Sequence, residues 1–337
     1  MSNLNDLTAL ALPSGSQLVA DATESRLSLS LDGQPLIRLR LDRKGQGPIQ
    51  IDEHYALPPG QALWAACYWL FARDPARQRL IWQLDQAPTE ALRSGLLVGT
   101  EVAGEYRCER TLFWQLPQPW LGNSLTGSYP QQMVISNGKR HPLRPVKPRG
   151  EVYRRFDAHL GAWISLRTVE IEQDLARFNR WQNSPRVASF WQEEGSLEQH
   201  REYLNKLDAD PHTLTLIGCF DDQPFAYFEA YWAKEDRIAP FYDADNYDRG
   251  IHMLVGEEDH RGPHKVASWL SALVHYLFLD DPRTQRVVAE PRADNAKMIG
   301  HMHNQCFHCD KEFDFPHKRA ALMILGRERF FDRCTLV

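Results

Sequence analysis

The sequence predicts an α/β fold of the α+β kind, a mixed central sheet flanked by helices, occurring twice in tandem with a degenerate N-terminal copy. Three observations predict it. Strand-like alternation with turn residues opens the chain, and strand and helix patterns then alternate to its end. One short segment of the second half is also similar to a segment of the first. A chain of 337 residues favours two domains over one.

The first half begins with a β-meander and continues into a buried helix. Residues 26–51 alternate apolar and polar side chains around a turn at Asp32-Gly33, after a weakly apolar lead-in. A proline-glycine cluster at 58–60 ends the meander. A helix that is apolar on most sides follows from Gln61 to Asp74. The elements expected next are a strand at 79–85, a helix at 89–98 and a strand at 111–116.

A change of composition separates the two halves. Glycine and proline cluster between residues 115 and 150, which predicts a linker at 121–150 between domains at 1–120 and 151–337. The second half again alternates strand and helix patterns. Its expected elements are a strand at 163–167, helices at 171–181 and 197–207, a hairpin that turns at 221–224, strands at 250–255, 286–290 and 320–325, and helices at 266–278 and 295–304.

The internal similarity relates residues 276–288 to residues 69–81. YLFLDDPRTQRVV lines up without gaps on WLFARDPARQRLI. The same offset places Gly45 opposite His252 and Gln83 opposite Glu290. If the two halves are copies of one fold, the first has lost a candidate base and a candidate acid, so we expect it to be a scaffold.

The composition limits the partners and the compartment. A net charge of −5 gives no reason to expect nucleic acid. The six cysteines show no framework spacing and are expected to be reduced. The N-terminus lacks the features of a signal peptide, and no apolar run approaches the ~20 residues of a membrane helix. We therefore expect a cytoplasmic protein that binds neither nucleic acid nor membrane.

The strongest functional pattern lies between Tyr231 and Asn295. A short apolar strand, a loop with basic and imidazole side chains and an amphipathic helix from Val266 follow one another. This order can hold a phosphate group at the helix N-terminus, where backbone N–H groups and the helix dipole meet it. Gly262 allows close approach of the backbone. Glycine-proline turns before helices are common, so this loop by itself is a weak signal.

His252 and Glu290 are polar residues within apolar strand patterns. If those strands are parallel neighbours joined by the helix between them, both side chains lie near the carboxyl ends of the strands, where ligands of such sheets bind. Either residue alone is better explained as a satisfied polar group at a strand end. Together, on the two sides of a candidate phosphate loop, they favour acid–base chemistry.

Two segments suggest metal sites only superficially. His301 and His303 lie two residues apart on a predicted helix and therefore face different sides. The nearby Cys306-x-x-Cys309 has no second pair at zinc-finger spacing. Residues 241–248 resemble a calcium loop without its glycine and distal glutamate, and their acidic groups either bind a cationic substrate or are solvated. We expect no metal.

Several stretches of the second half carry a resemblance to a known family: HPLRPVKPRGEVYRR (141–155), NRWQNSPRVASFW (179–191), YWAKEDRIAPFYDADNYDRGIH (231–252), the Arg-Gly of the loop and RVVAEPRADNAKM (286–298). The order of elements resembles the Gcn5-related N-acetyltransferase (GNAT) fold, and the second half is similar to its siderophore-biosynthesis branch. That branch includes the hydroxylysine acetyltransferase of aerobactin synthesis, hydroxyornithine acetyltransferases of pyoverdine type and the lysine acyltransferase of mycobactin synthesis. The resemblance covers about residues 141–330.

The resemblance implies roles for the matching residues. The family's histidine on the fourth strand falls on His252, and its acidic residue on the fifth strand falls on Glu290. It also implies acetyl-CoA, or another acyl-CoA, as co-substrate, and no metal. The residues expected at the cofactor are Leu254, Val255, His260, Arg261, Gly262, His264, Lys265 and Asn295. Those expected at the substrate are Trp191, Tyr231, Trp232, Asp243 and Asp245.

One position departs from the family's pattern. The family's loop has a second glycine where this chain has His264, and the cations Arg261 and Lys265 are expected to offset the lost backbone contact. The implied acyl-CoA lies between two parallel strands, and the substrate nitrogen attacks the thioester directly, since no serine or cysteine is placed as a nucleophile. His252 suits the base by its intrinsic pKa, and Glu290 orients it or takes the proton itself.

The leading hypothesis is therefore an acetyl-CoA-dependent N-acyltransferase that converts hydroxyornithine or hydroxylysine to a hydroxamate in siderophore biosynthesis, for iron acquisition. A GNAT acyltransferase for another amine, such as an antibiotic or a polyamine, is an alternative. A non-catalytic acyl-CoA-binding scaffold is a third, suggested by the altered loop and opposed by the retention of both His252 and Glu290. The partner is a small amine or hydroxylamine, and the protein is either a monomer or a homodimer.

Overall fold

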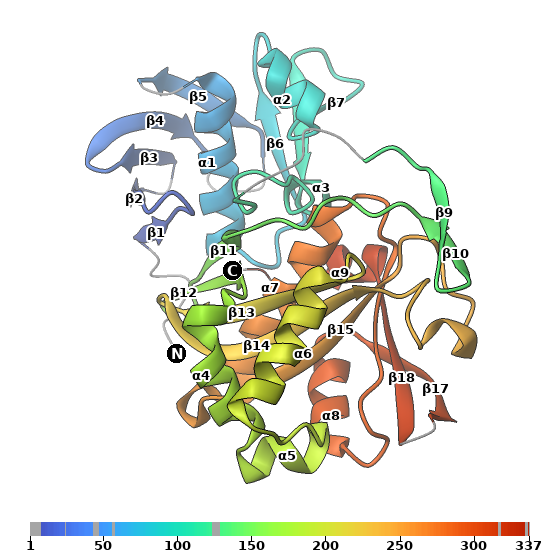
Figure 1. Ribbon diagram of the computed structural model, residues 1–337. Coiled ribbons are helices and arrows are strands. Elements are labelled where there is room, and N and C mark those ends of the chain that lie inside the picture. Colours follow the sequence, from blue (N-terminus) through green and yellow to red (C-terminus); the bar gives the residue numbers. More distant parts are fainter. Residues whose placement is uncertain are drawn as a thin grey trace. The chain divides into compact units, whose positions relative to one another are not determined.

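The structure is a computed structural model that describes residues 8–336 apart from 24, 43–46, 56–57, 123–128, 316–317 and 334–335. The chain forms two compact units. One contains residues 1–119, 155–162 and 335–337, and the other contains residues 120–154 and 163–334. Two eight-stranded sheets, each accompanied by helices, make up most of the chain (Figure 1).

The first sheet has the strand order β1-β2-β3-β4-β5-β6-β8-β7. Its parallel pair is β5 with β6, where Gln50 lies opposite Gln83. The elements are β1 (Ala9–Ala11), β2 (Gln17–Ala22), β3 (Arg26–Leu31), β4 (Gln34–Arg40), β5 (Ile49–His54), α1 (Pro59–Arg73), β6 (Arg79–Gln83), α2 (Thr89–Ser94), β7 (Val98–Gly99), β8 (Glu105–Glu109) and α3 (Arg110–Phe113).

Most of these elements were predicted. The meander, the buried helix α1, the strand β6 and the helix α2 are confirmed. The strand expected at 111–116 is wrong, because the strand β8 ends at Glu109 and Arg110 begins a short helix. The weakly apolar lead-in also contains β1 and β2, whose short apolar runs gave too little alternation to be recognised.

The second sheet has the order β11-β12-β13-β14-β15-β16-β18-β17, and a separate hairpin pairs β9 with β10. Its parallel pair is β15 with β16. The elements are β9 (Met133–Ser136), β10 (Lys139–Pro142), β11 (Glu151–Asp157), β12 (Ala162–Thr168), α4 (Ile171–Gln182), α5 (Pro185–Trp191), α6 (Leu197–Ala209), β13 (Thr213–Phe220), β14 (Gln223–Trp232), η2 (Ala239–Phe241), β15 (Arg249–Val255), η3 (Glu258–His260), α7 (Pro263–Asp280), β16 (Arg286–Ala289), α8 (Ala296–Asn304), β17 (His308–Asp314), β18 (Arg319–Gly326) and α9 (Arg327–Arg333).

The expected elements of the second half are all present, and several were missed. The missed ones are β9, β10, β11, α5, β17 and α9. The strand β17 has little apolar alternation, because of its seven residues only Phe313 is buried. The helix α5 is one of the short missed elements, at seven residues.

The two sheets have the same topology. In each sheet five strands are followed by a helix and a sixth strand that is parallel to the fifth. A hairpin of two strands ends the sheet, and its second strand, β8 or β18, pairs with the sixth strand. The short internal similarity therefore reflects two copies of one fold. The register of the parallel pair changes the expected counterpart of His252 in the first sheet. Gln83 is the counterpart of Glu290, and Gln50 lies opposite Gln83, so Gln50 takes the place of His252. Gly45, predicted for that place, lies outside the described residues.

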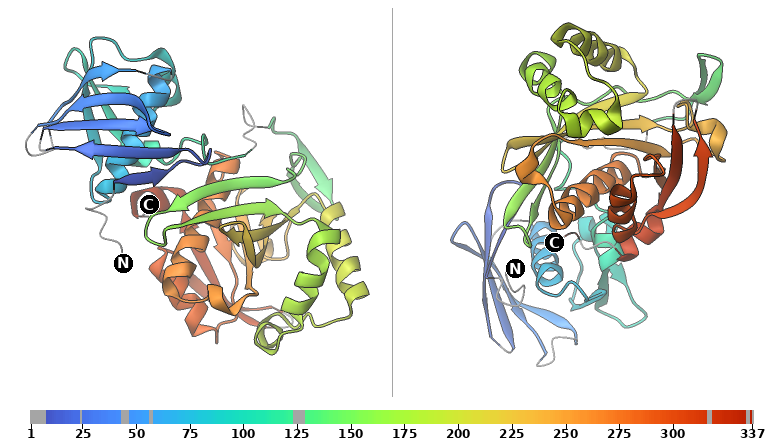
Figure 2. Two further views of the ribbon diagram at one scale, coloured as in Figure 1. Left: turned by 90° about the vertical axis from the view of Figure 1, so that its left-hand side faces the viewer. Right: turned by 90° about the horizontal axis from the view of Figure 1, so that it is seen from below.

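Helices cover both faces of the second sheet. The helices α4 and α6 lie on one face and α7 lies on the other, as Figures 1 and 2 both show. Successive residues of β14 face these two layers alternately. Tyr227 packs against Phe178 of α4, whereas Phe228 stacks on Trp269 of α7.

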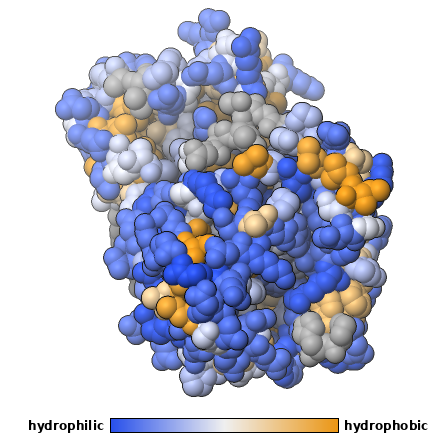
Figure 3. Space-filling model, in the orientation of Figure 1, coloured by the Kyte–Doolittle hydropathy of each residue, from blue (hydrophilic) through white to orange (hydrophobic). Residues whose placement is uncertain are grey.

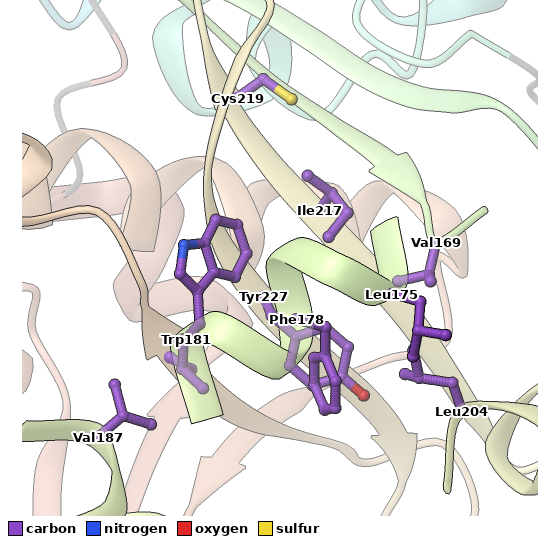
Figure 4. Close-up of a cluster of buried hydrophobic side chains, with 10 residues drawn as sticks. Val169, Leu175, Phe178, Trp181, Val187, Leu204, Ile217, Cys219 and Tyr227 are labelled. Carbon is purple, nitrogen blue, oxygen red and sulfur yellow. The ribbon is translucent and has the colours of Figure 1, made fainter. Parts of the chain in front are cut away.

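A buried apolar cluster fixes α4 and α6 to the sheet (Figure 4). Burial of large apolar side chains is the main stabilising contribution to such a layer. Its members are Val169, Leu175, Phe178, Trp181, Val187, Leu204, Ile217, Cys219, Tyr227 and Leu254. The face of the molecule seen in Figure 3 is largely hydrophilic, with small separate apolar patches.

Residues 139–147 of the expected linker belong to the second unit, and their cationic side chains bind other parts of it. Lys139 donates to the carbonyls of Glu235 and Asp236, and Lys147 donates to three carbonyls between residues 207 and 213. Arg144 forms a bidentate pair with the carboxylate of Glu235, at 2.6 and 2.7 Å. The division into functional domains at 1–120 and 151–337 with a linker between them stays a prediction.

Candidate active site

The candidate site lies where β15 and β16 separate. The two strands pair only at Arg249–Val287 and Gly250–Val288. Beyond these pairs, the side chains of His252 and Glu290 join the diverging segments, with His252 Nε2 at 2.7 Å from Glu290 Oε1. The two residues that the sequence singled out are therefore in direct contact.

A second carboxylate holds the other side of the imidazole. Glu229 of β14 lies opposite His252 in the sheet register, and its Oε2 is 2.8 Å from His252 Nδ1. Glu229 and Glu290 are 5% and 2% exposed, whereas the side chain of His252 is 22% exposed. The imidazole is thus the part of this cluster that solvent and small molecules reach.

The two carboxylates set the charge of His252. An ionised carboxylate only accepts hydrogen bonds, so both ring nitrogens must donate, which only the imidazolium can do. Burial would lower the pKa of His252, but the charges and hydrogen bonds of Glu290 and Glu229 outweigh it and raise the pKa to about 10. The expectation that His252 keeps its intrinsic pKa is therefore wrong, and at neutral pH the residue holds a proton.

The pKa values of the two carboxylates are shifted in the opposite direction, downward. Burial would raise the pKa of Glu290, but the charge and hydrogen bond of His252, with Lys318 and Tyr231, lower the pKa to about 2. The pKa of Glu229 is also lowered, because His252, Tyr203 and Tyr227 outweigh its burial. All three groups of the cluster are charged at neutral pH.

Tyr231 reaches this cluster because Gly250 has no side chain. The two residues are cross-strand partners, and a Cβ at position 250 would lie only 2.0 Å from the tyrosine ring. The ring therefore lies over the glycine, and its hydroxyl donates to Glu290 Oε2 at 2.7 Å. Its centroid is 4.8 Å from that of His252. Tyr231 thus contacts both Glu290 and His252, and its role at the substrate stays a prediction.

Glu229 is the functional residue that the sequence reasoning missed. Its Oε1 accepts hydrogen bonds from Tyr203 of α6 at 2.6 Å and from Tyr227 at 2.9 Å. One signal could have found it, since Glu229 is a carboxylate inside an otherwise apolar strand and lies two residues before Tyr231, on the same face.

Of the other residues expected at the substrate, only Trp191 has a described ring contact with the cluster. Trp191 lies beside the cluster, with its ring edge-on to His252 at 6.3 Å between centroids. Trp232 does not, since it follows Tyr231 in the strand and faces the opposite side of the sheet, where Arg249 and Arg144 stack on it. Its role in the substrate channel stays a prediction. Asp243 and Asp245 are exposed in the turn before β15, and their substrate role stays a prediction.

The predicted phosphate loop forms a structured turn at the start of α7. Gly262 is the N-cap residue with φ +118°, a conformation that side-chain-bearing residues rarely adopt, and Pro263 begins the helix. Lys265 Nζ donates to the carbonyl of Asp259 at 3.0 Å and lies 3.1 Å from His260 Nδ1. Arg261 and His264 are exposed. The loop therefore offers cations and first-turn N–H groups, as a phosphate site requires.

The remaining expected cofactor residues have identifiable structural partners. Leu254 belongs to the buried cluster under α4. The carbonyl of Val255 accepts a hydrogen bond from Arg186 of α5 at 2.8 Å. Asn295 is the N-cap of α8, and its side chain accepts from the N–H of Met298. These contacts leave the cofactor roles of the three residues as predictions.

The described residues contain neither a metal-binding cluster nor a membrane-spanning helix. Among the described residues, no group of three or more histidine, cysteine or acidic side chains is arranged to hold a metal ion. Every helix in the described part of the chain is too short or too polar to span a bilayer.

Comparison with known proteins identifies relatives of this chain. A family model described as an acetyltransferase (GNAT) domain matches residues 170–315. A putative lysine N-acyltransferase of Schizosaccharomyces pombe is 48% identical over 232 residues, which are 68% of this chain and 69% of that protein. The N(6)-hydroxylysine O-acetyltransferase of Escherichia coli is 44% identical over 67% of this chain and 72% of that protein.

A longer fungal protein and a solved structure are also similar. The N(5)-hydroxyornithine:cis-anhydromevalonyl coenzyme A-N(5)-transacylase of Beauveria bassiana is 42% identical over 80% of this chain and 57% of that protein. The crystal structure of an uncharacterized protein from Bacillus halodurans superposes with a TM-score of 0.53, at 28% identity, over 55% of this chain and 95% of that one.

The charge state of His252 can be measured directly. In protein labelled with ¹⁵N-histidine, NMR at pH 7.5 should show both ring nitrogens of His252 protonated, with a titration midpoint near pH 10. Glu229→Gln and Glu290→Gln should each lower that midpoint by roughly 1–3 pH units, because each removes one adjacent negative charge. A neutral His252 at pH 7.5 in the unmodified protein would contradict the assignment.

The same cluster should make stability depend on pH. His252 has its pKa raised from 6.5 to about 10, so its contribution is complete below pH 6.5 and is lost as the pH rises through 10. Glu290 has its pKa lowered from 4.5 to about 2, so its contribution is complete above pH 4.5 and is lost as the pH falls through 2. Urea unfolding of His252→Gln should therefore differ most from the unmodified protein between pH 4.5 and 6.5. A pH-independent difference would refute this account.

Proposed function

The chain belongs to the GNAT acetyltransferase family and is an acyltransferase, and we propose that it acylates the side-chain hydroxylamine of hydroxyornithine or hydroxylysine to a hydroxamate in siderophore biosynthesis. The cluster formed by Glu229, His252 and Glu290 carries the proposal. It places a proton-holding imidazole at the point where the two parallel strands separate. The names of the relatives supply the substrate class.

We place the acyl-CoA along the separating strands. The backbone of Leu254 and Val255 borders the gap, and the cations of Arg261 and Lys265 with the N-terminus of α7 suit its pyrophosphate. His260, Gly262, His264 and Asn295 complete the proposed cofactor residues. Catalysis is assigned to residues 151–337, and the unit with Gln50 and Gln83 is assigned a structural role.

The charge of His252 changes the order of the proton transfers. A hydroxylamine nitrogen is weakly basic and arrives neutral, so it can attack the thioester carbon without prior help from a base. When the tetrahedral intermediate collapses, the C–S bond breaks and the imidazolium of His252 turns one N–H from its carboxylate to protonate the departing sulfur. Because His252, with a pKa of about 10, is a weaker acid than a thiol, whose pKa is roughly 8.5 in the cysteine model, this transfer is completed by the one that follows it. The resulting neutral imidazole then takes the proton from the acylated nitrogen. That transfer restores the imidazolium, and Glu290 and Glu229 hold the ring in place and stabilise its charged form.

The atom that receives the acyl group needs a separate test, because the Escherichia coli relative is named an O-acetyltransferase. The nitrogen of a hydroxylamine carries the available lone pair at neutral pH, whereas its O–H is a very weak acid. We therefore propose N-acylation. A hydroxamate chelates ferric iron through both oxygens and an O-acyl hydroxylamine does not, so the coloured ferric complex identifies the product.

A substrate panel tests the proposed activity. Thiol release from acetyl-CoA should occur with hydroxyornithine or hydroxylysine, and should be much slower with ornithine and lysine, whose amines are protonated at neutral pH. The product should form the ferric hydroxamate complex. Turnover of polyamines or aminoglycosides in preference to both hydroxylamines would favour a different acceptor, and turnover of no acceptor would refute the proposal.

The catalytic assignment has matched controls within the same chain. His252→Ala and Glu290→Gln should each lower kcat by roughly 10²-fold or more, because each disables the proton transfer. Gln50→Ala and Gln83→Ala change the equivalent positions of the first sheet and should leave kcat unchanged. Near-normal rates in either variant of the first pair would remove that residue from the mechanism.

A further inference from the structure

Arg237 lies at the accessible side of the catalytic cluster, and the mechanism above does not use it. Its Nη2 is 3.8 Å from Glu290 Oε1, which is beyond hydrogen-bonding distance, and its side chain is 51% exposed. Among the described residues, it makes no hydrogen bond to the protein. Its guanidinium therefore has donors available for an incoming group.

The arginines around it are already engaged. Arg144 forms two hydrogen bonds with Glu235, Arg286 pairs with Asp248, and Arg292 pairs with Asp294. Arg237 differs from them because its nearest carboxylate, that of Glu290, is already bonded to His252 and Tyr231. A second carboxylate would satisfy it better.

The chain on the N-terminal side of Arg237 is held firmly. Arg144 and Lys139 bind the side chain and carbonyl of Glu235, and Lys139 also binds the carbonyl of Asp236. The carboxylate of Asp236 accepts hydrogen bonds from the N–H of Ile238 and from His212. The guanidinium of Arg237 itself lies over the ring of Phe315, at 5.5 Å from its centroid. A fixed backbone with an exposed charged end is suited to binding a ligand at a defined distance from Glu290.

Arg237 presents an exposed positive charge beside the cluster. His252, Arg237 and Lys318 are cations near the carboxylates of Glu229, Glu290 and Glu193, and Arg237 is the exposed one of the three cations. Burial together with the charges of Arg237 and Arg292 lowers the pKa of Lys318, although Glu290 opposes this effect. A carboxylate next to Arg237 would pair with this exposed positive charge.

We propose that Arg237 binds the α-carboxylate of the acceptor, so that the site selects an amino acid over the corresponding decarboxylated diamine. This inference rests on the proposed function. In a hydroxyornithine the carboxylate carbon is five bonds from the reacting nitrogen. Each bond is about 1.5 Å long, and because the extended chain zigzags, the distance between these two atoms is roughly 6 Å. A nitrogen at His252 would therefore leave the carboxylate within reach of a guanidinium that already lies beside Glu290. A guanidinium fork matches a carboxylate in two parallel hydrogen bonds.

The test compares two hydroxylamines that differ only in the carboxylate. Hydroxyornithine and N-hydroxyputrescine are assayed by formation of the ferric hydroxamate complex. The proteins compared are the unmodified protein, Arg237→Gln, Arg237→Lys and a control, Arg79→Gln. Arg79 is an exposed arginine of the first unit. Arg237→Gln should lower kcat/KM for hydroxyornithine by roughly 10- to 100-fold, mainly through KM, because a charge-assisted hydrogen-bond pair is lost. It should leave kcat/KM for N-hydroxyputrescine nearly unchanged.

The other outcomes are distinct. Arg237→Lys should keep an intermediate preference for the amino acid, and Arg79→Gln should behave as the unmodified protein. An equal loss with both hydroxylamines would show that Arg237 acts through Glu290, and a raised KM for acetyl-CoA alone would show that it binds the cofactor; either result overturns the inference. Acylation of both compounds with no preference in the unmodified protein overturns the inference but not the proposed function. Acylation of neither overturns both.

Discussion

The site depends on one imidazole held between two buried carboxylates. His252 bonds to Glu229 on one side and Glu290 on the other. Glu229 and His252 lie on the adjacent strands β14 and β15, and Glu290 directly follows the next strand, β16. Buried charges are stable only when they are paired and hydrogen-bonded. The surrounding features meet that need, since three tyrosine hydroxyls donate to the carboxylates and Gly250 makes room for one of them. The outcome is a histidine that stores a proton at neutral pH.

The first sheet shows what the fold is without this cluster. It repeats the strand order and the parallel pair of the second sheet, but Gln50 and Gln83 occupy the places of His252 and Glu290. Arg40 lies opposite Gln50, where Glu229 lies opposite His252. No ionised carboxylate–imidazole pair can form from these three side chains. The topology by itself therefore does not supply the chemistry, which comes from residues at a few positions of a sheet that both units share.

The segment expected as a linker contributes to the catalytic unit. Arg144 and Lys139 bind Glu235 and the backbone next to it, and Lys147 binds the end of α6 and the start of β13. These contacts fix the turn that carries Arg237 beside Glu290. A composition rich in glycine and proline indicated an irregular segment but not its partners, because hydrogen bonds to carbonyls distant in sequence leave no local pattern.

The sequence by itself determined the fold class, most of the long elements, the family and the pair His252 and Glu290. It did so because strand and helix periods are local, and because polar residues inside apolar strands are visible without a structure. Only the tertiary structure brought Glu229 to the second ring nitrogen and showed that Gln50 replaces His252 in the first sheet. Each of these depends on register between strands far apart in the chain. The charge of His252 depends on the same register, because a pKa is set by the groups that surround it in space rather than by its neighbours in sequence.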